Sequence, residues 1–451
     1  MKSPRKTGLD AWRLWLVPGM GVKRHVALAV LGALVMVAGV IGAVLWWFNE
    51  RRETLADPIE SVLISGPWRA LGGWVSLALV IVGVAIAIAA VGRLNRSLLS
   101  NWMPRPQDAA ELLHKRVLLG RGPRIVILGG GTGTSNLLRG LREHTSNLTA
   151  IVAVSDDGGS SGRLRKAFDM PAPGDLTDCL AALSSDESSL SRLLQHRFTR
   201  GEELEGHTFG NLLITTLREH EGDFGQALRA LNEILDLSGA VYPATAEPVT
   251  LEVTKRDGRI VKGESAVRTE AGPVGSVTLS PASPRTLPEV ERALLQADLI
   301  VLGPGSLFTS TIPPLLVPGV RTALQRSSAG LVYVANIMTE AGETDGLDAY
   351  DHVAALMEHG SRCPDVVIMN EDALDDQRLR SYAAEGAQVV DLSLSRFEEA
   401  GIPFECLPLL VEGRLAQHDS VKLATALVRA ARVHRRQTVS DARHTLVEAR
   451  T

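Results

Sequence analysis

Two strand–loop units lie in succession between Arg124 and Arg165, and they constrain the fold more than any other part of the chain. The apolar run 124–128 leads into the glycine-threonine loop 129–134, and the run 148–155 leads into the loop 156–163. Continuous apolar runs are typical of strands covered on both faces. A glycine loop between such a strand and a helix exposes N–H groups that suit a phosphate, and acidic residues after the next strand suit a ribose hydroxyl or a metal ion. Together the two units predict a nucleotide site.

The rest of the soluble part alternates between strand and helix patterns. Strand runs are expected at 299–302, 331–334, 366–369 and 388–390, and helical periodicity is expected at 137–142, 209–220, 287–295, 350–359 and 420–435. This alternation predicts an α/β fold with a doubly wound, parallel, Rossmann-like sheet. An alternating segment at about 249–279, with a turn at Asp257-Gly258, predicts a small antiparallel insertion.

Two apolar runs near the N-terminus predict a transmembrane hairpin ahead of that domain. Helices at about 25–48 and 72–92 are long enough to cross a hydrocarbon layer of roughly 30 Å. Trp46, Trp47 and Trp74 lie near the run ends, where interfacial anchors are found. A cleaved signal peptide and buried helices of a soluble protein are the alternative interpretations.

The charges beside the two runs predict their orientation. Six Lys or Arg residues precede the first run, and Arg93, Arg96 and Arg105 follow the second. By the positive-inside bias, we expect a multi-pass protein of the cell membrane with both termini and the main domain in the cytoplasm. The expected organisation is a basic N-terminus (1–24), the hairpin (25–92), a linker (93–123), the nucleotide-binding domain (124–436) and a loose tail (437–451).

Charge and cysteine usage exclude some classes of protein. A net charge of −4 over 451 residues gives no reason to expect a nucleic-acid partner. Three widely spaced cysteines, Cys179, Cys363 and Cys406, argue against a disulfide framework or a structural zinc.

The glycine loop does not follow the standard dinucleotide pattern. The third glycine of G-x-G-x-x-G is replaced by Thr134 when the pattern is counted from Gly129, and by Asn136 when it is counted from Gly131. A P-loop is excluded because no Gly-Lys-Ser/Thr follows. The alternative is that these glycines only permit a tight turn from strand to helix.

Candidate binding residues lie in loops that follow the predicted strands. Asp156 and Asp157 suit a ribose, a Mg²⁺ ion or a catalytic base, and their structural alternative is a solvated turn. His207 is more often a cap or surface residue than a catalyst. The predicted nucleotide-binding residues are Gly130, Gly131, Thr132, Gly133, Thr134, Asp156, Asp157, Gly158, Ser160, Ser161, Arg163, Asn211, Gly303, Gly305, Ser306, Thr309 and Asn336.

Seven motifs, taken together, resemble the YvcK/CofD-like family. They are GGGTGTSNLLRGL (129–141), LTAIVAVSDDGGSSGRLR (148–165), PAPGDL (171–176), HTFGNLL (207–213), YPAT (242–245), GPGSLFTS (303–310) and NIMTEAGETDG (336–346). The resemblance covers the soluble domain and leaves out the hairpin. The chain departs from the family pattern at Thr177-Asp178, where an arginine followed by a polar residue is common.

The resemblance implies two functions. One branch of the family contains gluconeogenesis factors, which bind UDP-N-acetylglucosamine and support cell-wall and cell-shape maintenance on gluconeogenic carbon; the DDGGSSGRLR segment is similar to this branch. The other contains 2-phospho-L-lactate transferases. In both cases residues 130–134, Asp156, Asp157, Asn211 and the loop 303–309 are implied to surround the ligand.

The leading hypothesis is therefore a membrane-anchored regulator that binds UDP-N-acetylglucosamine. The alternative is a phosphotransferase of the 2-phospho-L-lactate transferase type that depends on Mg²⁺, the one candidate cofactor, held near Asp156 or Asp157. An NAD-dependent dehydrogenase is a third interpretation, which the missing third glycine disfavours. A second copy of the chain and cell-wall synthesis proteins are candidate partners.

Overall fold

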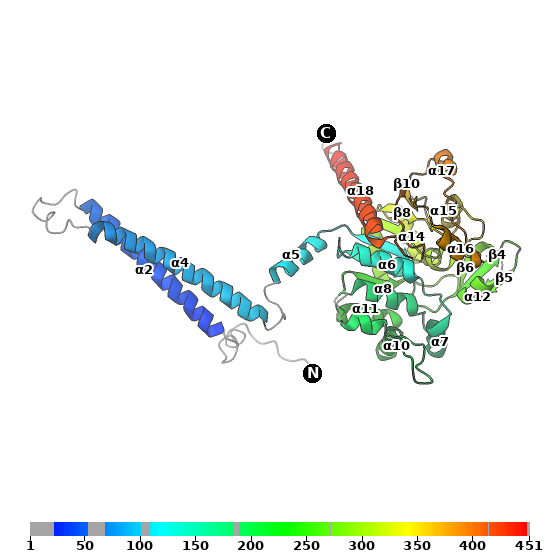
Figure 1. The fold of residues 1–451 in the computed structure, drawn as a ribbon, viewed down its shortest axis with the longest axis horizontal. Helices are drawn as coiled ribbons and strands as arrows, with labels where there is room; N and C mark the ends of the chain where they lie inside the picture. Colours follow the sequence, from blue (N-terminus) through cyan, green and yellow to red (C-terminus); the bar gives the residue numbers. More distant parts are fainter. Residues whose placement is uncertain are drawn as a thin grey trace, which may run out of the picture. The chain divides into compact units, whose positions relative to one another are not determined.

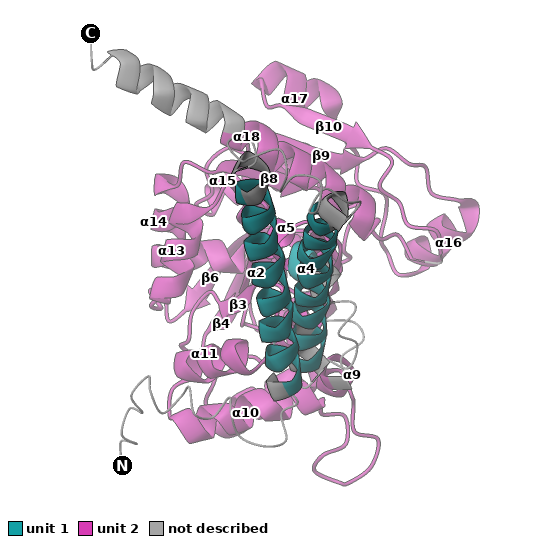
Figure 2. Ribbon diagram, turned by 90° about the vertical axis from the view of Figure 1, so that its left-hand side faces the viewer, with its two compact units in different colours: residues 1–115 teal, residues 116–451 magenta. Residues whose placement is uncertain are grey.

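The computed structural model describes residues 22–52, 68–100, 109–184, 189–235, 237–270, 272–413 and 415–448. The chain divides into two compact units, residues 1–115 and 116–451 (Figure 2). The expected basic N-terminus, 1–24, lies almost wholly outside the described residues.

Two long apolar helices make up the described core of the first unit. α2 (Val22–Arg52) and α4 (Trp68–Ser100) pack along each other through small residues. A Cβ atom added to Gly83 would lie 2.5 Å from the backbone nitrogen of Met36, and one added to Gly39 would lie 2.8 Å from that of Val80. Glycine therefore lets the two backbones approach closely, as in paired membrane helices.

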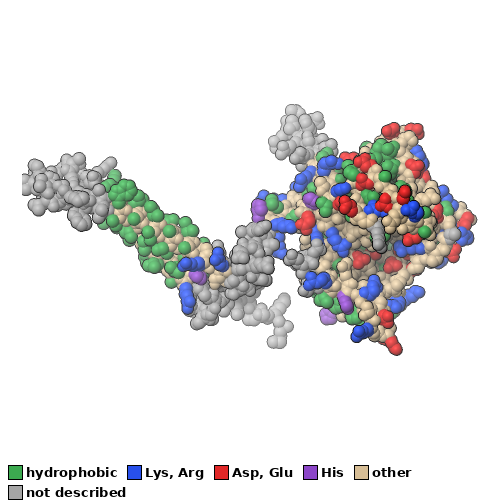
Figure 3. Space-filling view, in the orientation of Figure 1, with side chains coloured by type: hydrophobic (Ala, Val, Ile, Leu, Met, Phe, Trp, Pro, Cys, Tyr) green, Lys and Arg blue, Asp and Glu red, His purple; other side chains and the backbone are tan. Residues whose placement is uncertain are grey.

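The outer surface of this helix pair is apolar. Arg24–Phe48 and Gly72–Leu94 are long and apolar enough to cross a membrane, and only 11% and 17% of their most apolar windows are buried. Leu34, Leu45 and Ile88 are among the exposed side chains, and Figure 3 shows hydrophobic side chains along the visible face of the helix pair. The two apolar helices expected from the sequence are present, and they are compatible with membrane anchoring.

A seven-stranded parallel sheet forms the centre of the second unit (Figure 1). Its order is β10-β9-β8-β7-β1-β2-β3. The strands are β1 (Ile125–Gly129), β2 (Leu148–Val152), β3 (Ala240–Pro243), β7 (Leu299–Leu302), β8 (Gly330–Val334), β9 (Val366–Asn370) and β10 (Phe404–Leu407). All residues of β1, β7 and β8 are buried, which explains their continuous apolar sequences. The predicted parallel α/β fold is confirmed.

Individual elements differ from the prediction at the sheet edges. The strand expected at 388–390 is wrong, because only Val389 pairs there, in an isolated bridge to Met338. β3 and β10 were not predicted as strands; each has four residues and lies at an edge of the sheet, where one side has no partner strand.

The strand order reverses between β1 and β7. The chain moves from β1 to β2 in one direction and from β7 through β8 and β9 in the other. Because crossovers between parallel strands are right-handed, opposite directions place the connecting helices on opposite faces of the sheet. α6 contacts both α8 and α18 beside the central strands. A reversal of this kind opens a crevice at the carboxyl ends of the strands.

The expected insertion is a three-stranded antiparallel sheet with one short helix. β4 (Thr250–Lys255) pairs with both β5 (Ile260–Lys262) and β6 (Val274–Ser280), and α12 (Glu264–Thr269) lies between β5 and β6 in the chain. This part of the fold prediction is confirmed.

The remaining described helices connect and cover these strands. The helix that ends the domain was expected at 420–435, but it continues to Glu448, so the predicted end is too early. The helices are α5 (Ala109–Gly120), α6 (Gly131–Leu141), α7 (Gly159–Phe168), α8 (Gly174–Leu183), α9 (Ser189–Leu194), α10 (Phe209–Glu221), α11 (Phe224–Ile234), α13 (Pro288–Gln296), η3 (Leu307–Thr311), η4 (Pro313–Leu316), α14 (Pro318–Arg326), α15 (Ala349–Glu358), α16 (Asp376–Ala384), α17 (Leu394–Ala400) and α18 (Ser420–Glu448).

Candidate functional site

A cavity of about 690 Å³ lies where the strand order reverses. Its walls come from the loops after β1, β2, β7 and β8, from the insertion helix α12, and from the segment that leads into α18. Of the predicted binding residues, those that line it are Gly130, Gly131, Thr132, Gly133, Asp156, Gly305, Ser306 and Asn336. The sequence thus predicted four of the loops that meet here.

The glycine loop is shaped by close backbone contacts. Gly131 has φ +65°, a conformation that favours glycine, and it opens α6. A Cβ atom on Gly133 would lie 2.6 Å from the carbonyl oxygen of Pro304, in the loop after β7. The Thr134 hydroxyl donates a 3.2 Å hydrogen bond to that same oxygen. Gly133 therefore lets the loops after β1 and β7 approach closely, and Thr134 joins them by a hydrogen bond.

The carboxylate of Asp175 lies at the start of α6, where an anion would be expected. A Cβ atom added to Gly130 would clash with Oδ2 of Asp175, so the carboxyl group packs directly against the glycine loop. Burial, together with the neighbouring charge of Asp156, raises the pKa of the Asp175 carboxyl to about 7. An acidic side chain of the protein thus occupies a position that resembles the phosphate sites of other glycine loops.

Two glutamates bind the loop after β7 to the loop after β8. Ser306 donates a 2.6 Å hydrogen bond to Glu340. Glu343 accepts hydrogen bonds from the backbone N–H groups of Phe308 (2.8 Å) and Thr309 (3.2 Å). Burial, with the nearby charge of Glu340, raises the pKa of Glu343. Thr309 is fully buried by these contacts and does not line the cavity.

The insertion contributes two charged residues to the wall. On α12, Arg268 donates a 2.8 Å hydrogen bond to Glu264, and both side chains line the cavity. Burial raises the pKa of Glu264 to about 8, although Arg268 opposes the shift. The sequence reasoning missed both residues, because it treated the insertion only as an interruption of the domain.

The two aspartates after β2 are used differently. Asp156 lines the cavity, and its carboxylate accepts a 2.9 Å hydrogen bond from the N–H of Gly158. Asp157 does not line the cavity; its carboxylate accepts a 2.9 Å hydrogen bond from the N–H of Ser265 on α12. Ligand contact by either residue remains a prediction.

Asn211 and Ser160 belong to a buried hydrogen-bond network behind the cavity wall. Asn211 donates to Ser160 (3.1 Å) and accepts from Thr177 (2.8 Å). Ser160 is also hydrogen-bonded to His207 Nδ1 at 2.8 Å. This network joins α7, α8 and α10, and it gives Thr177, the residue at which the chain departs from its family pattern, a defined structural contact.

The other predicted residues do not line the cavity. Arg163 donates a 2.8 Å hydrogen bond to the carbonyl oxygen of Glu205. Ser161 is buried, and Gly158 adjoins Ser265. Gly303 has φ +75° in the turn after β7. Their role in binding a ligand also remains a prediction.

Among the described residues that line the cavity, two buried side-chain atoms have no hydrogen-bond partner. They are Oδ1 of Asn336 and Nε2 of His418. Burial lowers the pKa of His418 to about 4, so its ring is neutral at neutral pH. Buried polar atoms are nearly always hydrogen-bonded, so these two indicate a place for water or ligand groups. His418 carries no sequence motif, and only tertiary structure reveals it.

The charges of the wall are mostly negative. Among the described lining residues are seven carboxyl side chains, those of Asp156, Asp175, Asp178, Glu264, Glu340, Glu343 and Glu385, and one Lys or Arg side chain, that of Arg268. Burial raises the pKa of Asp178 as well as those of Asp175, Glu264 and Glu343. The cavity is therefore less negative near neutral pH than the count of carboxyl groups suggests.

The described residues include no group of three or more His, Cys, Asp or Glu side chains arranged to hold a metal ion. Asp156 and Asp175 are carboxylates of the cavity wall whose charges interact. Their hard oxygens suit Mg²⁺, which commonly takes one or two carboxylates and completes its shell with water and substrate phosphates. Asp157, engaged with Ser265, is less suited to this role than the sequence predicted.

The sheet and its cavity are those of the doubly wound α/β class, in which ligand crevices lie at the reversal of strand order. Comparison with known proteins identifies the family. The model of the family described as 2-phospho-L-lactate transferase CofD matches residues 125–410. The chain belongs to this CofD family.

Relatives of known name and structure agree with this assignment. The chain is 40% identical to a gluconeogenesis factor of Bacillus subtilis over 312 residues, which cover 69% of this chain and 98% of that protein. A crystal structure of a Bacillus halodurans protein superimposes with a TM-score of 0.66 at 40% identity, covering 68% of this chain and 100% of that one.

Similarity to one relative extends beyond the soluble domain. A Deinococcus radiodurans protein is 45% identical over 430 residues, covering 92% of this chain and 89% of the relative. Because 92% of the chain is more than residues 116–451 provide, the match reaches into the first unit.

Proposed function

We propose that this chain is a membrane-anchored gluconeogenesis factor that binds UDP-N-acetylglucosamine in the cavity at the reversal of strand order. Binding without turnover would make the protein a regulator that supports cell-wall and cell-shape maintenance on gluconeogenic carbon. The family assignment and the gluconeogenesis-factor name of the Bacillus subtilis relative support the general role. The nucleotide-sugar ligand extends that role to a specific molecule.

The observation that carries the proposal is the meeting of four polar loops around one cavity. Loops after parallel strands, with a glycine loop at the start of an eleven-residue helix, are suited to phosphate groups. The cavity volume is within the range of small-molecule sites. The unpartnered atoms of Asn336 and His418 supply an acceptor and a neutral ring nitrogen for polar groups of a ligand.

Calorimetry on the full chain in detergent tests this ligand. We expect saturable heat with UDP-N-acetylglucosamine, weaker binding of GDP and NAD, and an unchanged ligand by phosphorus NMR after prolonged incubation. Absence of heat with every uridine nucleotide would overturn the proposal.

The anchor and its orientation are a separate part of the proposal. The apolar surface of α2 and α4 favours insertion in a bilayer, and the basic residues flanking the two spans favour cytoplasmic termini. We expect the full chain to stay in the membrane pellet after alkaline carbonate extraction, and the soluble domain to be cleaved by protease only in inverted vesicles. Release into the supernatant would contradict anchoring.

A second candidate function is Mg²⁺-dependent phosphotransfer of the 2-phospho-L-lactate transferase type. The family model's own description favours it, as do the carboxylates of Asp156 and Asp175 in the cavity wall. Phosphoryl transfer needs positioning and charge neutralisation, which a bound Mg²⁺ supplies. A labelled nucleotide donor incubated with a deazaflavin acceptor and Mg²⁺ distinguishes it, because a binding regulator yields no labelled product.

A further inference from the structure

The insertion reaches the cavity through a single cationic side chain. Arg268, on α12, is the only Lys or Arg among the described residues of the wall. Its side chain keeps 58% of its surface exposed, while its partner Glu264 keeps 11%. The contact with Glu264 uses Nη2, and a guanidinium carries five N–H donors. The guanidinium is thus held at one end and accessible at the other.

The carboxyl group of Asp175 lies against the glycine loop at the start of α6, in the wall of the cavity. Burial and the charge of Asp156 raise the pKa of Asp175, whereas the Gly131 N–H and the charge of Arg268 lower it. A ligand phosphate that took the place of this carboxylate would meet the N–H groups at the start of α6 and lie within electrostatic reach of Arg268. Arginine suits such a contact, since its planar fork can bind two phosphate oxygens.

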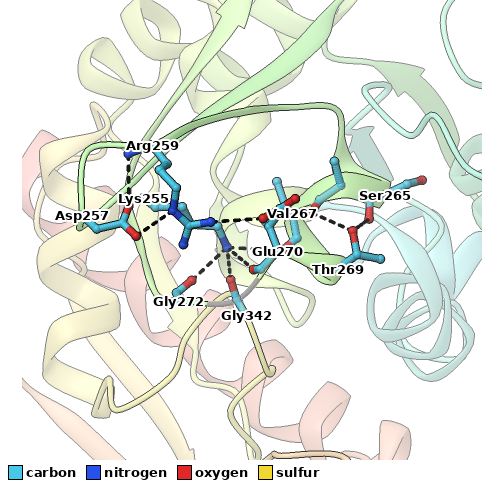
Figure 4. A network of polar contacts seen from close by, with 10 residues as sticks. Lys255, Asp257, Arg259, Ser265, Val267, Thr269, Glu270, Gly272 and Gly342 are labelled. Carbon is cyan, nitrogen blue, oxygen red and sulfur yellow. Dashed lines mark hydrogen bonds and ion pairs between the residues drawn. The ribbon is translucent and has the colours of Figure 1, made fainter.

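The position of α12 is fixed by a buried lysine (Figure 4). Lys255, on β4, is only 2% exposed, and its Nζ donates to the carbonyl oxygens of Val267 (3.3 Å), Glu270 (2.9 Å) and Gly272 (2.8 Å). A further bond joins it to the carbonyl of Gly342, in the loop after β8. The ammonium therefore ties the end of α12 to a loop that carries Glu340 and Glu343 of the cavity wall.

The first turn of α12 is held from the other side. Asp157, in the loop after β2, accepts the Ser265 N–H at 2.9 Å. Lys255 and Asp157 together fix both ends of a helix that has only six residues. Such a short helix has little stability of its own, so its place at the cavity depends on these contacts.

We propose that Arg268 is the residue of the insertion that binds the phosphate group of the ligand, and that Lys255 and Asp157 are positioning residues that hold it at the cavity. The proposal rests on the proposed function for the nature of the ligand, a nucleoside diphosphate compound. The insertion would then take a direct part in recognition of the ligand.

The test compares Arg268→Gln with Lys262→Gln in the full chain in detergent. Lys262 lies on β5 of the same insertion and pairs with Glu252, so its replacement removes an equal charge outside the cavity. Calorimetric titrations use UDP-N-acetylglucosamine, inorganic pyrophosphate and uridine. We expect Arg268→Gln to weaken the two phosphate compounds about tenfold or more and to leave uridine unchanged, because a charge-assisted hydrogen bond is lost. Lys262→Gln should bind all three as the parent does.

The outcomes separate this proposal from the function on which it rests. If the parent binds UDP-N-acetylglucosamine and Arg268→Gln binds it equally well, the role of Arg268 is overturned and the proposed function stands. If the parent binds pyrophosphate in an Arg268-dependent way but not UDP-N-acetylglucosamine, the nucleotide-sugar proposal fails and Arg268 keeps its role. If the parent binds neither, both are overturned.

A double-mutant cycle tests the positioning role of Lys255. Lys255→Met alone should weaken pyrophosphate binding, measured well below its unfolding temperature. If Lys255 acts through Arg268, Lys255→Met combined with Arg268→Gln should bind no more weakly than Arg268→Gln alone. Additive losses in the double variant would show that Lys255 has no such role. Lys255→Arg, which retains a cation, should recover part of the affinity.

Discussion

Asp157 is joined to Ser265 by a 2.9 Å hydrogen bond from the serine N–H to the aspartate carboxylate. The two residues are 108 positions apart, so the contact joins the loop after β2 to the first turn of α12. The two adjacent aspartates therefore have different structural roles. Asp156 faces the cavity, whereas Asp157 holds the helix that carries Arg268.

Replacing Asp157 tests this division. Asp157→Ala leaves the Ser265 N–H without its acceptor, so we expect a loss of about 1 kcal/mol in the free energy of unfolding and weaker binding of UDP-N-acetylglucosamine. Asp157→Asn keeps an acceptor oxygen and should behave closer to the parent. Thermal unfolding and calorimetry measure the two effects; an alanine variant with parental stability and affinity would contradict the assignment.

Gly133 permits the close approach of two loops, and its replacement should separate them. A methyl group in Gly133→Ala would lie 2.6 Å from the carbonyl oxygen of Pro304, so the loop after β7 must shift. We expect both a lower unfolding temperature and weaker ligand binding, although alanine favours a helix by about 1 kcal/mol over glycine.

Gly131→Ala is the matched comparison for that variant. Nothing lies within 4 Å of a Cβ atom at this position, but its φ of +65° is unfavourable for alanine. We expect a cost of about 1–2 kcal/mol in stability and little displacement of the loop after β7. Crystal structures of the two variants would separate backbone strain from steric displacement.

Replacement of Asn336 should weaken ligand binding and leave the stability of the fold nearly unchanged. Its Oδ1 is buried and has no hydrogen-bond partner among the described residues, so Asn336→Ala removes no bond of that atom to them. We expect the unfolding free energy to change by less than about 0.5 kcal/mol, while affinity for UDP-N-acetylglucosamine falls. Equal affinity in variant and parent would remove Asn336 from the site.

The protonated carboxyl groups of the cavity predict a dependence on pH. Asp175, with a pKa of about 7, and Glu264, with a pKa of about 8, retain protons in the folded state that the unfolded chain releases near pH 4. The folded state thus binds more protons between about pH 4 and pH 8, so the unfolding free energy contributed by these groups falls as pH rises through that window. Denaturant titrations at several pH values measure this fall.

Binding of an anionic ligand should follow the same direction. Deprotonation of Asp175 and Glu264 adds negative charge to the cavity, so affinity for UDP-N-acetylglucosamine is expected to decline between about pH 6 and pH 9. The double variant Asp175→Asn and Glu264→Gln should flatten the profile. An affinity that rises with pH in the parent would contradict this account.

Much of the fold was predictable because its dominant signals are local. Buried parallel strands such as β1 and β8 are continuously apolar, and glycine and aspartate loops follow them directly. Edge strands were not predictable in the same way. β10 is only partly buried, and its apolar and polar residues alternate no more clearly than those of a loop. Its place depends on pairing with β9, which no short window of sequence contains.

The sequence predicted the site residues that lie at the ends of parallel strands. It did not predict the residues that the packing of α12 brings to the cavity. Parallel strands bring their carboxyl ends to one edge, which explains why Gly130, Ser306 and Asn336 meet at the cavity. By contrast, Arg268 reaches the wall because Lys255 and Asp157 dock α12 there. The same motif that suggested ligand contact for Asn211 serves a buried network instead of the cavity lining.

The carboxyl group of Asp175, near the Gly131 N–H at the start of α6, also affects the heat that calorimetry records when a ligand binds. A phosphate arriving beside it would raise its proton affinity, and the solution would supply the proton. The calorimetric enthalpy near pH 7 should then contain the ionisation enthalpy of the buffer. Titrations in Tris and in PIPES should differ in heat but agree in affinity, and the difference counts the protons that accompany each ligand into the cavity.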